Sequence, residues 1–558
     1  MGARSAAGRP LHAGRSRALS RDPRRSPAVS AGLLVLLVFF ALPILYFFAR
    51  ALADRSLQEL LGIAADILSR GETRRVILFT VGQATLTAVI SLVVALPGAY
   101  LLSHYRFPLR RLLYSLSLLP FVLPSIIVVV CMISFYGRNG LVNRLLPGDL
   151  NLVYNFGGII LAHVFYNFSL ALRIIADGWA GIDRRYAEVS NSLGDRGFSL
   201  FRRVTLPLLT PSIISAFLLV FIYSFLSFGI VLVFGGIQFS TFEVKIFEEM
   251  NVNLDLAAAS VYALLQLLFS FAFIFAVARG VAGTATEREQ ITAGSGLRPL
   301  GSLPLALRVA AGAYLVGIVL FLLGPIFTMI LRAFSTESGL GLENFRELFV
   351  PGASPRDIAA VIRSSVAGVI VRSVLVALTS GLGTMLLTVP IVLALRGRRT
   401  PFLDSVFQVP IGVSFVTLAI GLRLLYGGLL PPLLLVVAGQ VFVAFPIVFR
   451  ILRSAVDELR EHYVESAAAL GAKGLRLSRD ITLPLLRRPL LNAFAYSLAI
   501  AFADLTIVLT VGAGRVTTFP VAIYRLIGFR SFDVALALGV VYLAICLLLF
   551  RIIDSTSR

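Results

Sequence analysis

The side chains best suited to do chemistry are two glutamates, Glu188 and Glu465, which hold the same place in a twenty-residue phrase that occurs twice. The first copy, at 188–207, reads EVSNSLGDRGFSLFRRVTLP, and the second, at 465–484, reads ESAAALGAKGLRLSRDITLP. In both copies a glycine follows the glutamate by six positions and a proline follows that glycine by thirteen, and the copies are 277 positions apart. Neither copy holds a nucleophile paired with a base or a set of metal ligands, so the pattern predicts docking of a partner rather than catalysis.

Short helices must position these glutamates. Each phrase predicts a helix that ends at its glycine, then a short amphipathic segment, then a proline that begins the next element. Two loops with identical spacing predict a partner with two equivalent grooves. The alternative is that each loop only rests apolar side chains at a membrane surface while its arginines stay in water. The predicted docking residues are Glu188, Gly194, Asp195, Arg196, Gly197, Pro207, Glu465, Gly471, Ala472, Lys473, Gly474 and Pro484.

A third carboxylate, Asp504, lies in an apolar stretch, and Ser227 holds the equivalent place in the first half of the chain. A charge at the centre of a bilayer costs ~2.5–3.5 kcal/mol, so this side chain should face the interior of a helix bundle. Two interpretations remain open: Asp504 and Ser227 line a passage for a cationic substrate or a gate, or Asp504 is a structural partner of an arginine or a backbone group. Other polar residues of the apolar stretches, for which hydrogen bonds between helices are the favoured explanation, are Gln83, His163, Tyr166, Asn167 and Gln266. We expect Arg423 to reach outward to water.

The composition is that of a membrane protein. Hydrophobic residues make up 58% of the chain, charged residues only 14%, and the mean hydropathy is +0.90, whereas soluble domains are about 25% charged. A run of about 20 apolar residues crosses ~30 Å of hydrocarbon. Such runs lie near 31–50, 76–102, 112–136, 156–176, 212–236, 257–279, 307–333, 366–395, 402–426, 430–452, 489–512 and 534–553. The expected fold is an all-α polytopic membrane protein with about 12 transmembrane helices, arranged as two tandem six-helix modules.

The net charge of +21 indicates topology rather than nucleic acid binding. Arginines gather before the first span and in alternate loops, whereas one opposite loop carries Glu243, Glu248, Glu249 and Asp255. The positive-inside rule therefore places both termini in the cytoplasm. We expect a basic cytoplasmic arm at 1–30, a first module at 31–282, a cytoplasmic linker at 283–304 and a second module at 305–558. The first apolar stretch is interpreted as a retained helix rather than a cleavable signal peptide, because its core exceeds the usual ~7–15 residues.

The sequence lacks the motifs that ATP hydrolysis and metal binding require. No Gly-x-x-x-x-Gly-Lys-Ser/Thr phosphate-binding loop occurs, and Lys245 and Lys473 are the only lysines. The four histidines are scattered, so no metal-ligand spacing is present. Cys131 and Cys546 lie in apolar spans and are interpreted as small buried hydrophobic residues.

The repeated phrase resembles the signature loop of permease subunits in bacterial ABC importers that use a binding protein. In that pattern Glu is followed after five residues by Gly, and after nine more by Ile or Val, any residue, Leu and Pro. Val189-Ser190 and Ser466-Ala467 replace the usual Ala-Ala pair. The resemblance covers essentially the whole chain, because one subgroup fuses two six-helix modules.

This resemblance implies that the two loops are coupling helices that dock into a separate ATPase dimer on the cytoplasmic face. It also implies a substrate-binding protein on the outer face, contact with membrane lipid, a bacterial inner-membrane location and no nucleic acid partner. No cofactor is expected in this chain, since ATP and Mg would be bound by the partner ATPase.

Three stretches, 136–140, 161–167 and 519–531, are more similar to the thiamine permease type than to the ferric-iron type. The chain is therefore interpreted as a transport subunit, not an enzyme, that moves thiamine by alternating access. Ferric iron is the alternative cargo. A secondary transporter of the major-facilitator type is the other alternative, because it too has twelve spans in two parallel halves. Such a carrier has no use for the paired loops.

Overall fold

The computed structural model describes residues 26–557 apart from several short stretches and two longer ones. The stretches outside the description are 54–55, 118–119, 121–122, 147–149, 151, 237, 283–296, 337–338, 351, 353–356, 399, 460–477 and 513. The second copy of the repeated phrase therefore lies outside the described residues up to position 477, together with most of the predicted linker.

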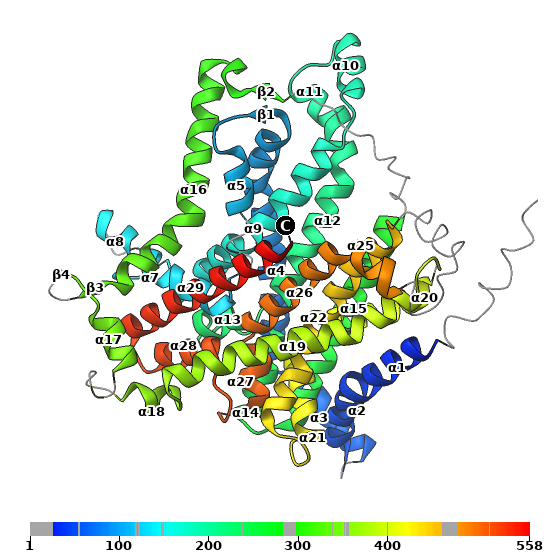
Figure 1. The fold of residues 1–558 in the computed structure, drawn as a ribbon, viewed down its shortest axis with the longest axis vertical. Coiled ribbons are helices and arrows are strands. Elements are labelled where there is room, and N and C mark those ends of the chain that lie inside the picture. The colour runs from blue at the N-terminus through cyan, green and yellow to red at the C-terminus, as the bar shows by residue number, and fades with distance from the viewer. Residues whose placement is uncertain are drawn as a thin grey trace, which may run out of the picture.

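The first half is a bundle of long helices with short helices at its ends (Figure 1). The first helix begins at Pro27, so residues 27–30 of the predicted basic arm are helical. The elements are α1 (Pro27–Leu36), η2 (Leu37–Ala41), α2 (Leu42–Leu52), α3 (Leu57–Ser69), α4 (Gly71–His104), β1 (Tyr105–Arg106), α5 (Arg110–Leu116), α7 (Ser125–Tyr136), α8 (Leu141–Leu145), α9 (Phe156–Ala180), α10 (Arg184–Ser192), α11 (Phe198–Leu200), η3 (Phe201–Thr205), α12 (Leu206–Phe225), α13 (Gly229–Phe234), α14 (Phe242–Asn251) and α15 (Leu256–Ala282).

The second half repeats this order. Its elements are β2 (Arg298–Pro299), η4 (Leu300–Ser302), α16 (Leu305–Ala333), β3 (Ser335–Thr336), β4 (Gly339–Leu340), α17 (Glu343–Phe349), α18 (Ile358–Ile362), α19 (Val366–Ala394), α20 (Pro401–Gln408), η5 (Val409–Gly412), α21 (Phe415–Tyr426), α22 (Pro432–Asp457), η6 (Ser478–Thr482), α25 (Leu483–Leu485), α26 (Arg487–Ala503), α27 (Thr506–Gly512), α28 (Phe519–Gly528) and α29 (Phe532–Ser557). The only pairings of described strands are two-residue ones: β1 with β2 in parallel, and β3 with β4 antiparallel.

Among the described residues, ten helices are long and apolar enough to cross a membrane, or twelve if each of two bent helix pairs counts as one span. The expected count of about twelve is therefore confirmed, and several of the spans are interrupted. The span predicted at 402–426 bends by 90° between η5 and α21, and the span predicted at 112–136 divides into α5 and α7. Proline explains both interruptions: Pro410 lies in η5 and Pro124 directly precedes α7, and neither has an N–H to continue a helix.

The fifth span of each half is also interrupted, and at equivalent positions. In the first half α12 ends at Phe225 and α13 begins at Gly229; in the second half α26 ends at Ala503 and α27 begins at Thr506, with a bend of 53°. The apolar runs at 212–236 and 489–512 are thus each divided between two helices. No proline causes these breaks, so the side chains at the breaks must satisfy the backbone groups that they free.

The first helix of each half packs on the other half. α2 lies against α21, and α16 lies against α7. Two tyrosines of the second half donate hydrogen bonds to backbone carbonyls of the first half. Tyr426 donates to Val38 at 2.8 Å, and Tyr314 donates to Val94 at 2.7 Å. A glycine, Gly421, lets α2 approach α21, because a Cβ there would collide with the backbone of the first helix. This exchange joins the two halves into one bundle.

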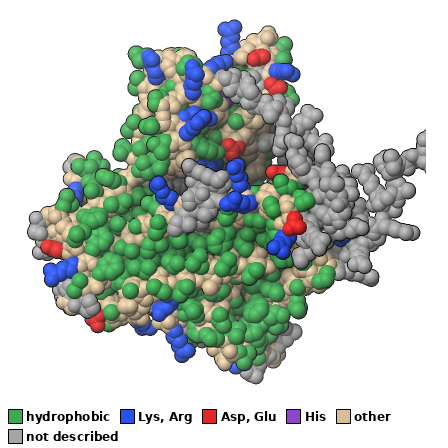
Figure 2. All heavy atoms as spheres, in the orientation of Figure 1, with side chains coloured by type: hydrophobic (Ala, Val, Ile, Leu, Met, Phe, Trp, Pro, Cys, Tyr) green, Lys and Arg blue, Asp and Glu red, His purple; other side chains and the backbone are tan. Residues whose placement is uncertain are grey.

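The surface fits a membrane environment. Figure 2 shows hydrophobic side chains over most of the broad lower part of the visible face, with Lys and Arg on the upper projection, at its base and along the lower edge. At one end α10 reaches the tip of the molecule, and α11 lies below it at about the level of β2 (Figure 1). These two short helices carry the first copy of the repeated phrase.

Candidate functional site

The projecting loop between α9 and α12 is built as a helix, a turn and a second helical segment. Asp183 begins α10 by accepting a hydrogen bond from the Arg185 amide at 2.9 Å. The helix ends as predicted at Gly194, whose φ of +95° is open to glycine at little cost, and Gly197 follows with a φ of +56°. The chain then continues through α11 and η3 directly into α12. Pro207 lies in the first turn of α12, where its missing N–H is tolerated.

Asp195 braces this loop. Its carboxylate accepts hydrogen bonds from Ser190 of α10, at 3.1 Å, and from Ser199 of α11. Arg203 of η3 completes the arrangement with an ion pair of 3.2 Å. The Ser199 hydroxyl first, then the Ser190 hydroxyl and the Arg203 guanidinium, hold the pKa of the Asp195 carboxyl below its ordinary value. Three segments of the loop are thus tied to one side chain.

The same loop presents apolar side chains to its surroundings. Leu193 is 82% exposed and Phe198 is 76% exposed, and Tyr186 and Val189 are also exposed. Glu188 lies on the same exposed helix, α10. Because the loop connects two candidate spans at the tip of the bundle, a cluster of exposed hydrophobic residues with a carboxylate is typical of a surface that docks a protein partner.

The second copy of the phrase can be compared mainly by sequence. Glu465, Gly471, Ala472, Lys473 and Gly474 lie outside the described residues, whereas Pro484 lies in α25. At the offset of 277, Ala467, Ala472, Arg476 and Asp480 stand where the first loop has Ser190, Asp195, Ser199 and Arg203. The side chains that brace the first loop are therefore absent from the second.

The two predicted pathway residues, Ser227 and Asp504, lie at the equivalent breaks in the fifth span of each half. Asp504 accepts a hydrogen bond from Nε2 of Gln440 at 3.2 Å, and also one from the amide of Ile507 at 3.2 Å. It therefore lies at the break between α26 and α27 and caps the first turn of α27. In the first half His163 Nε2 lies 2.7 Å from the Ser227 hydroxyl.

These two pairs are equivalent in the repeat. Gln440 follows His163 by 277 positions, as Asp504 follows Ser227, and both pairs join the fourth span to the break in the fifth. In the second half the network continues, because Ser380 of α19 donates to Oε1 of Gln440 at 2.9 Å. In the first half Nδ1 of His163 is buried without a hydrogen-bond partner in the described part of the chain. The break in the second half thus carries the carboxylate, and the break in the first half carries none.

The other polar residues of the spans bind between helices, as expected. Gln83 donates to the carbonyl of Ser224 at 2.7 Å, Asn167 donates to the Ser224 hydroxyl at 3.2 Å, and Gln266 donates to Glu243 at 2.8 Å. The expectation for Arg423 is wrong. Its guanidinium turns inward and donates to Oδ1 of Asn251 at 2.9 Å and to the carbonyl of Thr510 at 3.2 Å.

Glu243 is the residue that sequence reasoning missed. It was assigned to an acidic outer loop, but it is only 1% exposed and belongs to α14. Besides Gln266, its carboxylate accepts a hydrogen bond from the Ser414 hydroxyl at 2.9 Å and one from the Val416 amide at 3.3 Å. A carboxylate of the first half thus caps α21 of the second half. The apolar neighbours of Glu243 in the sequence were the available signal for its burial.

No group of three or more His, Cys, Asp or Glu side chains that could hold a metal ion occurs within the described ranges. Cys131 is buried, with its Sγ 3.5 Å from Sδ of Met329, and Cys546 is partly buried.

Comparison with known proteins agrees with the repeat. The family model described as the inner membrane component of binding-protein-dependent transport systems matches the chain twice, over residues 89–284 and 382–558. The thiamine transport system permease protein of Haemophilus influenzae is 27% identical over 496 residues, which cover 86% of this chain and 88% of that protein. The corresponding protein of Brucella abortus strain 2308 is 28% identical over 501 residues, covering 87% and 88%, and that of Escherichia coli K12 is 27% identical over 501 residues, covering 86% and 88%.

Proposed function

This chain belongs to the family of inner membrane components of binding-protein-dependent transport systems, as a fused permease with two modules, and from this premise we propose that it imports thiamine. It is a multi-pass membrane transport component, and its family is not that of the major-facilitator carriers. The proposal on cargo is supported by relatives named as thiamine permeases that align with more than four-fifths of the chain. Ferric iron remains the alternative, and it would have to cross without a tight permanent site in the described part of the protein.

We assign the α10–α11 loop to the coupling of transport with ATP hydrolysis in a separate ATPase dimer. The observation that carries this assignment is the exposure of Leu193 and Phe198 on a braced loop that projects from the bundle. Apolar side chains in this position gain free energy only when a partner covers them. The second loop, beginning near Glu465, would occupy the other subunit of the ATPase dimer.

The breaks at Ser227 and Asp504 offer a route for the cargo between the halves. Thiamine carries a permanent positive charge, and Asp504 is the carboxylate at these two breaks. In this proposal ATP binding draws the two loops together, and the halves exchange one packing for another around the breaks. A binding protein on the outer face would deliver the cargo, and both termini would lie in the cytoplasm, as the arginine distribution predicts.

Uptake of labelled thiamine and labelled ferric iron tests the proposal in a strain that lacks this gene. The strain is complemented with the wild-type chain, with Leu193→Ser, or with an empty vector. Loss of thiamine uptake in the empty-vector strain, with rescue by the wild-type chain and poor rescue by Leu193→Ser, is the expected result. Loss of iron uptake alone would transfer the proposal to the alternative cargo.

A further inference from the structure

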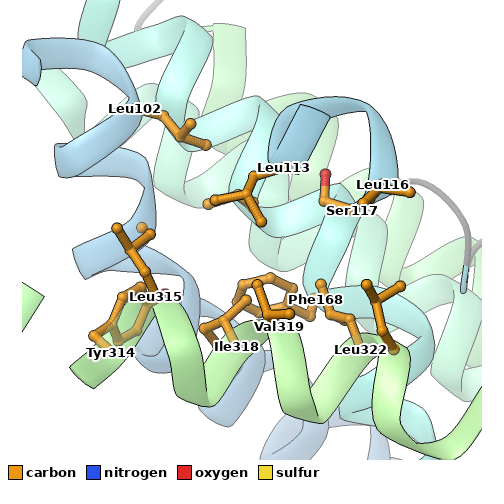
Figure 3. A pocket seen from close by; sticks show the side chains of 13 residues that line it. Leu102, Leu113, Leu116, Ser117, Phe168, Tyr314, Leu315, Ile318, Val319 and Leu322 are labelled. Atoms are coloured by element: carbon orange, nitrogen blue, oxygen red, sulfur yellow. The ribbon is translucent and has the colours of Figure 1, made fainter. Parts of the chain in front are cut away.

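A cleft on the side of the bundle is separate from the loops and from the breaks. It lies between α4, α5 and α9 of the first half and α16 of the second half, and it is a groove open to the surroundings rather than an enclosed cavity. Figure 3 shows side chains of α5 and α16 pointing into it. The lining residues are Gly98, Leu102, Leu113, Leu116, Ser117, Phe168, Leu172, Tyr314, Leu315, Ile318, Val319, Leu322 and Leu323.

The cleft offers nothing to a polar ligand. Its polar side chains, Ser117 and Tyr314, already donate hydrogen bonds to the backbone carbonyls of Tyr114 at 2.9 Å and Val94 at 2.7 Å. Every other lining side chain is a hydrocarbon or a glycine. A cationic cargo would lose its hydration here without compensation, and water finds no partners on such walls. The occupant must therefore be apolar.

The position of the cleft indicates which apolar molecule is available. α16 is one of the helices able to cross the membrane, and only 22% of its most apolar window is buried in the protein. Val316 and Leu320, next to the lining residues on the same helix, are 60% and 59% exposed and would face lipid. The cleft thus opens on the hydrocarbon of the bilayer, where lipid acyl chains are the available apolar molecules.

Four arginines lie on the segments that adjoin the cleft, near the start of α16 and of α5. Arg106 lies in β1, which pairs with β2, where Arg298 lies. Arg111 lies in the first turn of α5 and Arg308 in the first turn of α16, and all four arginines are exposed. None of the four forms an ion pair within the described part of the chain. The segments 98–117 and 298–323 hold no acidic residue. The carboxylate at this end, Asp177, accepts a hydrogen bond from Tyr114 at 3.2 Å.

We propose that this cleft binds one anionic phospholipid, whose acyl chain fills the space between α5 and α16 and whose phosphate lies among Arg106, Arg111, Arg298 and Arg308. Basic clusters at the ends of membrane helices attract anionic headgroups in this way. The lipid bridges the two halves, because α16 belongs to the second half and the other walls belong to the first. This inference depends on the fold of the membrane domain and not on the identity of the cargo.

Native mass spectrometry of the purified chain tests the proposal. The protein in nonionic detergent is titrated with phosphatidylglycerol or with phosphatidylcholine of the same acyl chains. The wild-type chain should retain phosphatidylglycerol in preference, with one tightest-bound molecule. Val319→Trp, which fills the cleft, should abolish that preference, whereas Val316→Trp, on the neighbouring lipid-facing surface of α16, should leave it unchanged.

The arginines give a second, independent arm. Arg111→Gln and Arg308→Gln should each weaken phosphatidylglycerol binding about five-fold, while Arg75→Gln, an exposed arginine at the other end of α4, should not. These surface variants decide the question if Val319→Trp fails to fold. Equal retention of the two lipids by the wild-type chain, or unchanged retention by the arginine variants, would overturn the proposal.

Discussion

Gln440 donates a hydrogen bond of 3.2 Å to the carboxylate of Asp504 across two helices of the second half. Its equivalent in the first half is the contact of 2.7 Å between His163 and Ser227. The geometry of the repeat is conserved between the halves, but only one half carries a formal charge at the break. We infer that the two halves contribute unequally to the passage of a cationic cargo. In this view Asp504 both caps α27 and attracts the positive charge of the cargo.

Asp504→Asn separates these two roles. The amide oxygen of asparagine can still cap α27 at Ile507, but its NH2 group cannot accept the hydrogen bond from Gln440. Membrane insertion should therefore persist, with a loss of stability of about 1–3 kcal/mol. Thiamine uptake should fall roughly tenfold, the loss expected when a charged hydrogen-bonding group is removed from a site. Asp533→Asn is the matched control, because Asp533 is 60% exposed at the periphery beside Arg332. Full uptake by a stably inserted Asp504→Asn protein would leave only the structural role.

Asp195→Asn should weaken coupling while leaving the bundle intact. The substitution removes the ion pair with Arg203 and one of the oxygens that hold Ser190 and Ser199, so the loop should lose order. We expect transport-coupled ATPase activity to fall several-fold in proteoliposomes. Asp183→Asn is the control, since asparagine caps a helix as well as aspartate does and α10 should persist. Equal activity of the two variants would show that the brace has no part in coupling.

Leu193→Ser and Phe198→Ser should reduce association with the ATPase partner. Both side chains are largely exposed in the isolated chain, so the melting temperature of the permease should not move. Each loss of a buried contact of ~1.5 kcal/mol in the complex should weaken co-purification about tenfold. Leu429→Ser provides the control, because Leu429 is 78% exposed in the turn between α21 and α22, which the proposed topology places on the opposite side of the membrane. Normal association of both loop variants would exclude this surface.

Glu243→Gln should destabilise the contact between the halves. The carboxylate accepts hydrogen bonds from Gln266, Ser414 and the Val416 amide, and a glutamine side chain has only one acceptor oxygen for them. A buried donor left unpaired costs about 1–3 kcal/mol, which a thermal melt in detergent would detect. Glu248→Gln, on the same helix but less buried, should melt like the wild-type chain.

The order of the α10–α11 loop should depend on pH only in acid. The pKa of Asp195 is lowered by its partners, so its contribution is complete above the ordinary aspartate pKa of about 3.9 and is lost as the pH falls through the lower folded value. Hydrogen exchange of residues 190–200, corrected for intrinsic rates, should be constant between about pH 7 and pH 5 and increase only below about pH 4. A transition near neutral pH, or the same acid transition in Asp195→Asn, would contradict this assignment.

The sequence predicted the repeat, the approximate number of spans, the helix that ends at Gly194 and the equivalence of Ser227 and Asp504. These features are local or periodic: a run of apolar residues determines whether a helix can cross a bilayer, and a constant offset pairs positions without any knowledge of their neighbours. The same reasoning failed at the breaks in the spans. Apolar composition alone does not distinguish one straight helix from two shorter ones.

Only the tertiary structure determined which groups meet. His163 and Ser227 are 64 residues apart, Gln440 and Asp504 are 64 residues apart, and Glu243 meets Ser414 across 171 residues. Each pair depends on how helices pack, which hydropathy does not encode. Each polar group is buried, so its hydrogen bond must be made by the partner that the packing brings to it. The amino-acid sequence by itself therefore determined that this protein is a duplicated membrane bundle in which one loop phrase occurs twice. The packing of its helices decided where a carboxylate caps the opposite half, where a charge lies at a break, and where a cleft opens to lipid, because these depend on distances between residues far apart in the chain.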